Sequence, residues 1–88
     1  MSLYDKALQA ITRAQASGDA KYGDTLEQSL ENTYPDKEAL AAQGHLIASM
    51  RGERYDTESG EPHAAHAAAR CIRLVMLQIQ AEEKDSRC

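Results

Sequence analysis

The stretch of sequence that decides the fold is residues 62–83, PHAAHAAARCIRLVMLQIQAEE, in which a proline suited to a first helical turn is followed by no glycine or further proline. A helical wheel at about 100° per residue gives this segment two faces. The first face is predicted to pack in the core and holds Ala65, Ala68, Ala69, Ile72, Val75, Met76 and Ile79. The second face changes from polar to apolar along its length and holds His63, His66, Arg70, Arg73, Leu74 and Leu77. Burial on two sides is typical of a central helix in a bundle or a dimer.

Cap and turn residues divide the rest of the chain into shorter helices. The residues that favour helix starts are Ser2, Asp24 or Thr25, and Pro35. Those that favour helix ends are Ser17-Gly18-Asp19, Tyr34-Pro35 and Gly52. Helices are therefore predicted at residues 1–16, 24–33, 35–51 and 62–83, with a loop at 52–61 and a frayed tail at 84–88. The predicted fold is all-α, a compact bundle of about four helices in one domain, 1–88.

The composition predicts a thin core. Apolar residues make up 42% of the 88 residues, but there is no Phe and no Trp, and much of the apolar content is alanine. A small chain that buries so few large side chains would be marginal alone, which favours a dimer or a higher homo-oligomer.

Charge and hydropathy exclude several classes of protein. A net charge of −4 argues against a nucleic-acid binder, which normally carries a basic patch. No apolar run reaches the roughly 20 residues that a membrane span needs, and the N-terminus has no signal core. We therefore expect a cytoplasmic protein. The two cysteines, Cys71 and Cys88, form neither a disulfide framework nor a zinc-binding spacing.

The loop at 52–61 and the start of the helix after it carry the strongest candidate site. Four metal-ligand side chains gather there: Asp56, Glu58, His63 and His66. The two histidines are three positions apart and so project from one side of the helix. Such a set suits Mg²⁺ or Mn²⁺ at a nucleotide, with zinc less favoured. The alternative is ordinary turn chemistry, in which Asp and Ser accept backbone N–H groups and the histidines are exposed.

Other polar residues allow a functional and a structural reading. His45 is a third imidazole or proton carrier for the loop site, or a partly buried helical histidine. Arg70 and Arg73 contact a triphosphate, or pair with acidic residues such as Glu82 and Glu27. The Lys21-Tyr22 pair offers a cation beside a ring for phosphate and base contacts, or is simply solvated. The remaining carboxylates are read as structural or exposed: Glu27, Glu31, Glu38, Glu53 and Glu61.

These motifs resemble the family of small phage and prophage proteins known as dATP/dGTP diphosphohydrolase, N-terminal domain. The shared elements are Lys21-Tyr22-Gly23, the helical His45, and the run Gly52-Glu53, Asp56, Glu58-Ser59-Gly60, His63-Ala64-Ala65-His66-Ala67. The resemblance covers about residues 20–79. Two departures are Asp24-Thr25, where the family has Asn-Trp, and Gly44, where it has an arginine.

The resemblance implies a metal-dependent protein that acts on nucleotides, in the manner of a (d)NTP diphosphohydrolase. Asp56, Glu58, His63 and His66 would hold Mg²⁺ or Mn²⁺ at the triphosphate, and the ion would activate the attacking water. His45 or Glu58 would serve as the base, with Arg70 and Arg73 stabilising charge. Tyr22 or Tyr55 would stack on the nucleobase. The alternative is a non-enzymatic phage protein that binds a host protein or sequesters a nucleotide, which the acidic surface and the missing arginine favour.

Overall fold

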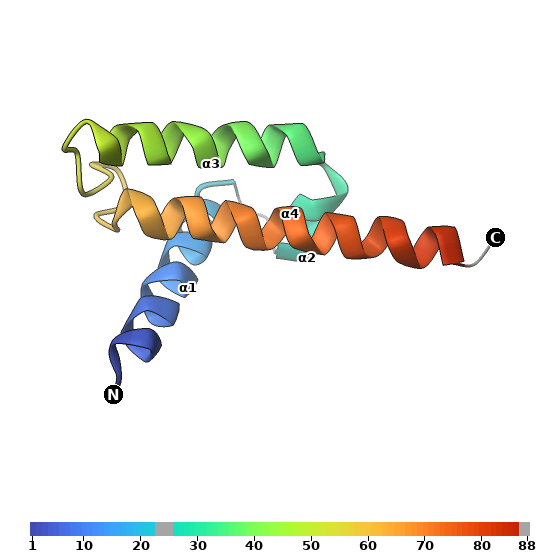
Figure 1. The fold of residues 1–88 in the computed structure, drawn as a ribbon, viewed down its shortest axis with the longest axis horizontal. Coiled ribbons are helices and arrows are strands. Elements are labelled where there is room, and N and C mark those ends of the chain that lie inside the picture. Colours follow the sequence, from blue (N-terminus) through green and yellow to red (C-terminus); the bar gives the residue numbers. More distant parts are fainter. Residues whose placement is uncertain (23–25, 87–88) are drawn as a thin grey trace.

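A computed structural model describes residues 1–22 and 26–86. Three long helices and one short one follow each other: α1 (Leu3–Tyr22), α2 (Leu26–Glu31), α3 (Pro35–Met50) and α4 (His63–Ser86) (Figure 1). The described residues contain no strand beyond one isolated bridge, between Tyr55 and Pro62. The all-α prediction is confirmed. In the part of the chain that is described, no helix is both long and apolar enough to cross a membrane.

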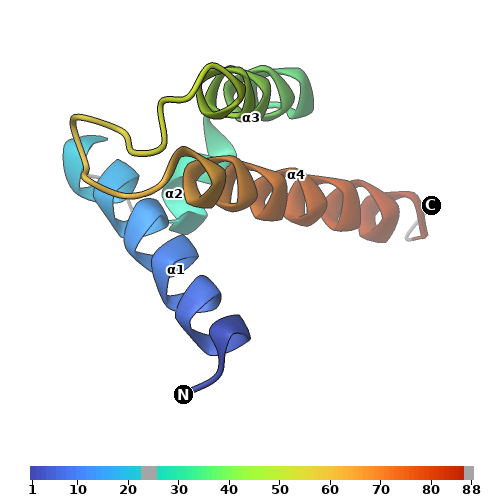
Figure 2. The ribbon, with the colours of Figure 1, turned by 60° about the vertical axis from the view of Figure 1, so that its left-hand side comes forward.

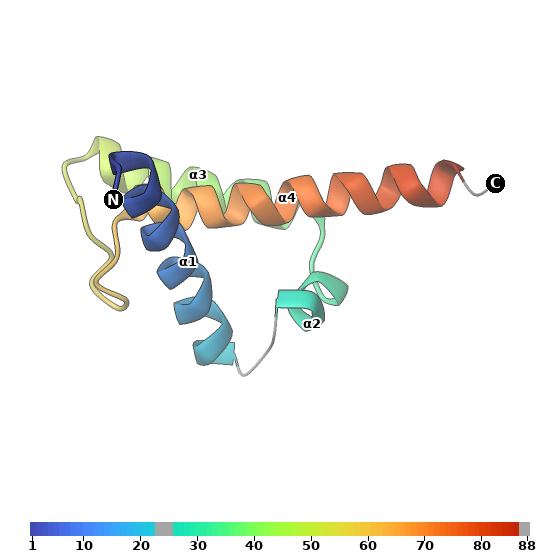
Figure 3. The same ribbon diagram turned by 90° about the horizontal axis from the view of Figure 1, so that it is seen from below.

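Helix α4 is the element against which α3 and α1 pack, whereas α2 contacts α1. It runs antiparallel to α3, and the loop at 51–62 joins the two at one end (Figure 1). On its other side α4 is crossed by α1, so that α4 lies between α3 and α1 (Figure 2). Seen from below, α1 and α2 lie on the same side of α4, and the C-terminal turns of α4 extend past them (Figure 3). The first half of α4 is thus covered on two sides, by α3 and by α1.

The predicted end of the first helix is wrong. Helix α1 does not stop at Ala16 but continues through Gly18 to Tyr22. A hydrogen bond from the Gln15 amide Nε2 to Asp19 Oδ1, 3.0 Å long and one helical turn apart, spans the predicted break. A glycine inside a helix costs only about 1 kcal/mol relative to alanine, so packing of α1 on α4 overrides it.

The other predicted boundaries are close to those observed. Ser2 caps α1 as predicted, because its Oγ accepts a hydrogen bond of 3.1 Å from the backbone N–H of Asp5. Pro35 begins α3. After α3, Gly52 has a φ of 94°, and the N–H of Glu53 returns to the carbonyl of Ala48 over 3.1 Å, as in a glycine-terminated helix. The predicted caps of the second helix, Asp24 and Thr25, lie outside the described residues, and α4 continues to Ser86 rather than to 83.

The predicted core face of α4 is only partly buried in the single chain. Its alanines 65 and 69 are buried, but Ile72, Val75 and Ile79 remain 47%, 51% and 47% exposed. The face read as polar is the one that meets α3, where His63 and Arg73 are each only 6% exposed. The apolar side chains that the described residues bury are small apart from one leucine: Ala14, Leu30, Ala42, Ala65, Ala67 and Ala69. The thin core is thus observed, and polar pairs fill the contact between the two helices.

Candidate functional site

A cluster of polar and charged side chains surrounds Glu38 at the start of α3. We call Glu38, Thr33, Arg70 and Arg73 the arginine cluster. The Glu38 side chain is fully buried, and its Oε1 accepts hydrogen bonds from Thr33 Oγ1 (2.8 Å) and Arg73 Nε (2.9 Å). Arg70 Nη1 lies 3.2 Å from Glu38 Oε2. Burial raises the pKa of Glu38, but the hydrogen bonds from Thr33, Arg73 and Arg70 outweigh it and hold the pKa below the ordinary 4.5. Glu38 is therefore a buried anion with its charge matched.

A second cluster lies two turns further along α3, and we call its members His45, His63 and His66 the histidine cluster. The Nδ1 atoms of His45 and His63 are 2.9 Å apart. The rings of His45 and His66 stack with their centroids 4.8 Å apart. His45 thus lies between two imidazoles that project from the first turn of α4.

The loop at 51–62 brings a carboxylate to the histidine cluster. Asp56 Oδ1 accepts hydrogen bonds from the backbone N–H groups of Glu58 (2.8 Å) and Ser59 (3.0 Å), and its own carbonyl accepts one from Gly60 (2.8 Å). Gly60 has a φ of 77°, a conformation that glycine adopts without steric cost. The N–H of His63 donates to the carbonyl of Arg54 over 2.9 Å, which fastens the loop to the start of α4.

The arrangement has the dimensions of a metal site. One ligand atom each from His45, Asp56 and His63 lie within 4.8 Å of one another, and among the described residues this is the group of metal-ligand side chains that meets so closely. Two ligand atoms about 2.05 Å from an ion and about 90° apart are themselves about 2.9 Å apart. The observed separation of the two Nδ1 atoms equals that value. The two imidazole nitrogens thus have the spacing of adjacent ligands of an octahedral cation, which is also the length of a hydrogen bond between them.

The far side of the His63 ring is incompletely satisfied. Its Nε2 is buried and has no hydrogen-bond partner among the described residues, although Glu53 Oε1 lies 3.5 Å away. If His45 Nδ1–H donates to His63 Nδ1, or if both Nδ1 lone pairs face an ion, the His63 proton sits on Nε2 and points at the Glu53 carboxylate. A ligating histidine commonly directs its second N–H at such a carboxylate. Glu53 is thus placed as an outer partner of His63.

The electrostatics of this cluster favour a neutral imidazole and an ionised carboxylate. Burial, followed by the neighbouring His66 and His63, lowers the pKa of His45 below its ordinary 6.5, against an opposing effect of Asp56. The backbone N–H of Ser59 has the largest effect on Asp56 and lowers its pKa; burial opposes this, and the N–H of Glu58 lowers the pKa further. Neutral imidazole and carboxylate are the protonation states that bind a metal ion.

A cavity of about 320 Å³ opens beside the histidine cluster. Its walls come from the end of α1, the α2–α3 linker, the start of α3 and the middle of α4. The residues that line it are Ala14, Gln15, Gly18, Asp19, Asn32, Thr33, Lys37, Glu38, His66, Ala69, Arg70 and Arg73. His66 lines the cavity and also stacks on His45 in the histidine cluster. Its Nε2 lies 2.6 Å from Ser59 Oγ, and this hydrogen bond fixes the ring.

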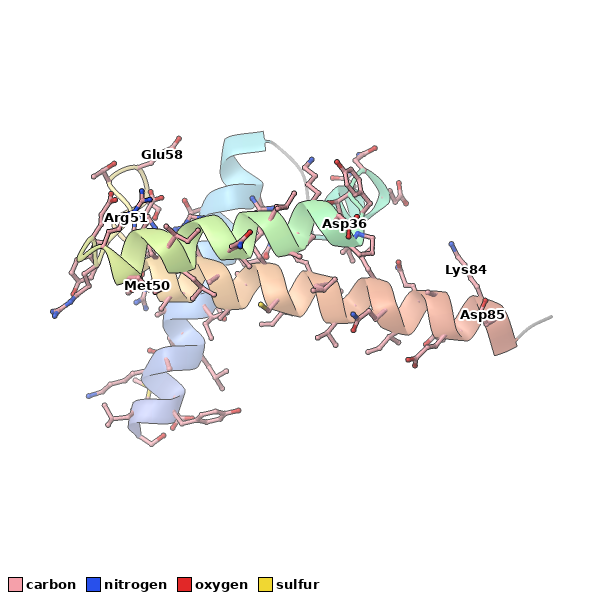
Figure 4. The ribbon with its side chains drawn as sticks, turned by 45° about the horizontal axis from the view of Figure 1, so that its top comes forward. Asp36, Met50, Arg51, Glu58, Lys84 and Asp85 are labelled. Atoms are coloured by element: carbon pink, nitrogen blue, oxygen red, sulfur yellow. The ribbon has the colours of Figure 1, made fainter. Side chains whose placement is uncertain are left out.

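The predicted site residues separate into two groups. The structure brings together Asp56, His63 and the helical His45, with His66 stacked alongside. Glu58 is exposed and points away from the helices at the loop, outside the group of three (Figure 4). The turn chemistry offered as the alternative for Asp56 is also present.

The predicted nucleotide-binding residues are more scattered. Arg70 and Arg73 lie at the cavity, where both pair with Glu38, and the side chain of Glu27, one of their predicted partners, lies outside the described part. Tyr55 is 53% exposed in the loop. Lys21 and Tyr22 belong to the last turn of α1, just after cavity residue Asp19, and their side chains lie outside the described part.

Sequence reasoning missed Glu38, which was assigned to an exposed helix face. Its signal was spacing: Glu38 and His45 are seven positions apart, so they share one face of α3. On α4 the arginines follow the histidines by the same seven positions. Two antiparallel helices with these matching intervals place the carboxylate opposite the arginines whenever the histidines meet. Ser59 and Glu53 were missed because loop geometry fixes their positions.

The family model described as dATP/dGTP diphosphohydrolase, N-terminal, matches residues 1–87 of this chain. The match extends beyond the resemblance found at residues 20–79 and includes α1. No curated protein and no solved structure matches the chain.

Proposed function

Because the chain belongs to the family of dATP/dGTP diphosphohydrolase N-terminal domains, we propose that it binds a divalent metal ion through His45, Asp56 and His63 and acts on a nucleotide there. The observation that carries the proposal is the convergence of those three ligand atoms within 4.8 Å. They come from α3, the loop and α4, so no single element's local structure explains their meeting. The family relates the chain to purine deoxynucleotides.

The residues around the three ligands have distinct roles in this proposal. When bound, the ion would polarise a phosphoryl oxygen and offset the charge that develops on it. His66, stacked on His45 and held by Ser59, is placed to carry a proton between the cavity and the ion site. Arg70, at the cavity wall, supplies a positive charge for phosphate. Arg73 is buried against Glu38 and serves to support that wall.

The donor set favours Mn²⁺ among the ions expected. Mg²⁺ prefers a shell of oxygen atoms alone, whereas Mn²⁺ accepts imidazole nitrogen beside carboxylate oxygen, and the 2.9 Å spacing of the two Nδ1 atoms is close to that of adjacent ligands of an octahedral ion. Mg²⁺ and Zn²⁺ are the comparison ions in the experiment that follows.

Calorimetric titration of the purified protein with Mn²⁺, then assay of dATP and dGTP turnover, tests the proposal. We expect His45→Ala and His63→Ala to lose Mn²⁺ binding. Glu58→Ala is the matched control, because it removes a carboxylate of the same loop that lies outside the three ligands, and it should leave binding intact. Wild-type protein that binds no divalent ion, or an equal loss in Glu58→Ala, contradicts the proposal.

The assay also separates the enzyme from its alternative. Stabilisation by a nucleotide without hydrolysis selects a protein that sequesters the nucleotide, since a ligand that binds only the folded state raises the melting temperature. Stable co-purification with a host protein selects the inhibitor version. Release of pyrophosphate from dATP or dGTP, lost in His63→Ala, selects the diphosphohydrolase.

We also infer that the chain self-associates, through α4. Ile72, Val75 and Ile79 follow a spacing of three and four positions along one face and remain about half exposed. A second copy would cover these side chains and complete a core that is thin in a single chain. Sedimentation at several concentrations measures this, and Val75→Lys should shift the equilibrium toward the monomer.

A further inference from the structure

The cavity beside the histidine cluster has the charge of an anion site. Among its lining residues Lys37, Arg70 and Arg73 are cationic, whereas Asp19 and Glu38 are anionic. The lysine, arginine, aspartate and glutamate side chains of the described lining therefore carry one excess positive charge, in a chain whose net charge is −4. The cavity also lies at the N-terminal turn of α3, where backbone N–H groups favour negative charge.

The two anions of the lining are already engaged. Glu38 is fully buried beneath Thr33 and Arg73 and accepts their hydrogen bonds. Asp19 Oδ1 accepts one of 3.0 Å from the Gln15 amide. A ligand that enters the cavity therefore meets partly neutralised carboxylates, and repulsion of an anion is reduced.

Arg70 is held in a position that leaves part of its guanidinium for a ligand. Among the described residues its hydrogen bonds to Glu38 are made through Nη1 alone, at 3.2 and 3.4 Å, and its side chain is 31% exposed. A guanidinium with one edge fixed presents its other N–H groups without further loss of rotamer freedom. Lys37, one position before Glu38 on α3, adds an exposed ammonium group at the same cavity.

We propose that this cavity is a subsite for a pyrophosphate group, bound by Lys37 and Arg70 without need of a metal ion. The volume of about 320 Å³ is at the small end of ligand pockets, and none of its described lining residues is Phe, Tyr or Trp to stack on a nucleobase. The choice of pyrophosphate rests on the proposed function, because a diphosphohydrolase handles that group both as the tail of its substrate and as its product.

Titration with inorganic pyrophosphate in the presence of EDTA tests the subsite, by calorimetry or by chemical-shift changes in α3 and α4. We expect binding to the wild type, and a loss of about tenfold or more in Lys37→Gln and in Arg70→Gln, the usual effect of removing a charge-assisted hydrogen bond. Lys6→Gln is the matched control, since it removes the same charge from an exposed position of α1 outside the cavity. It should bind pyrophosphate like the wild type.

Two results would overturn the subsite: no pyrophosphate binding in EDTA, or an equal loss in Lys6→Gln. Neither touches the metal proposal, which Mn²⁺ titration without phosphate decides separately. A parallel titration with dATP in EDTA distinguishes the two sources of the group. Binding of both ligands, weakened alike by Arg70→Gln, assigns the subsite to the triphosphate tail, whereas binding of pyrophosphate alone assigns it to the product.

Discussion

The arginine cluster and the histidine cluster repeat one arrangement a heptad apart. In each, a single side chain of α3 meets two side chains of α4 that are three positions apart. The corresponding groups are Glu38 with Arg70 and Arg73, and His45 with His63 and His66. Backbone geometry is thus shared, and the difference between the clusters lies in their chemistry.

The two clusters differ in whether their buried polar atoms have hydrogen-bond partners. In the arginine cluster an anion meets cations, and the Glu38 carboxylate accepts hydrogen bonds on both oxygens. In the histidine cluster like groups face each other, and no atom in the described part of the chain forms a hydrogen bond with the buried Nε2 of His63. A buried polar atom left unsatisfied costs about 1–3 kcal/mol. The same scaffold therefore stabilises the fold at one end and offers ligand atoms at the other.

Glu38→Ala should have the largest effect, a loss of about 3–5 kcal/mol in the free energy of unfolding, because it removes the buried carboxylate with which both Arg70 and Arg73 pair. That is a large share of the roughly 5–15 kcal/mol typical of a domain. Urea unfolding followed by circular dichroism measures it, with the milder Glu38→Gln in case the alanine variant does not fold.

Glu61→Ala is the control for Glu38→Ala. Glu61 pairs with Arg13 over 3.1 Å, but the arginine side chain is 57% exposed. Exposed pairs contribute about 0–1 kcal/mol. Similar losses in the two variants would show that the arginine cluster is no more than a surface pair in its effect on stability.

Glu53→Ala should weaken Mn²⁺ binding by about 10- to 100-fold while the fold persists, the usual effect of removing an outer partner of a ligating histidine. Glu53 is exposed and reaches His63 Nε2 only at 3.5 Å, so stability in the absence of metal should change little. Calorimetry measures the affinity, and thermal unfolding in EDTA checks the fold. Unchanged Mn²⁺ affinity would remove Glu53 from the metal site.

The two clusters should make the free energy of unfolding fall in different ranges of pH. The pKa of His45 is lowered on folding, so the unfolded chain takes up that proton first, and stability falls as the pH drops below about 6.5, by at most about 1.4 kcal/mol per pH unit. The pKa of Glu38 is also lowered, so its contribution is present above about 4.5 and is lost as the pH falls through its folded value. Unfolding measured from pH 7.5 to 3.5 should show both declines, and His45→Gln should abolish only the upper one. A single decline below pH 4.5 in the wild type would contradict the assignment to His45.

Local signals in the sequence predicted the helices well. Caps and breakers act through neighbouring residues, which is why Ser2, Pro35 and Gly52 mark boundaries close to those observed. Gly18 misled the prediction because a weak local preference yields to tertiary packing. The faces of α4 misled it further: hydropathy ranks Ile72 above Arg73, but an arginine that finds a buried carboxylate is the one that becomes enclosed.

For the candidate site, the sequence indicated where the polar side chains gather better than it indicated which of them meet. Asp56, His63 and His66 were grouped as candidate ligands of the loop and the helix after it, and His45 was read either as a third imidazole or proton carrier or as a partly buried histidine; the structure brings the four together. Glu58 has the right chemistry but faces outward, because Asp56 takes the inward position of the turn and accepts the Glu58 N–H. Composition and spacing cannot distinguish two carboxylates in one turn, since the hydrogen bonds of the folded loop decide which is directed inward.

Gly44→Ala should have the smallest effect on stability. It tests whether α3 acts as a rigid helix that presents one residue to each cluster. Gly44 is exposed within α3, and a Cβ added there would meet no atom within 4 Å. Alanine is better than glycine inside a helix by about 0.8–1.0 kcal/mol, so the variant should be more stable by about that amount. Urea unfolding measures the gain.

The same variant also tests whether the two clusters depend on the flexibility of α3, because Gly44 lies between them. It precedes His45 directly and lies six positions after Glu38. If α3 only presents two residues at a fixed interval, stiffening it at this point leaves Mn²⁺ affinity and the decline of stability below pH 4.5 as they are. A gain in stability accompanied by weaker Mn²⁺ binding would instead mean that α3 must bend to close the histidine cluster around its ion. The arginine cluster, already closed, would then be the fixed end about which that bending occurs.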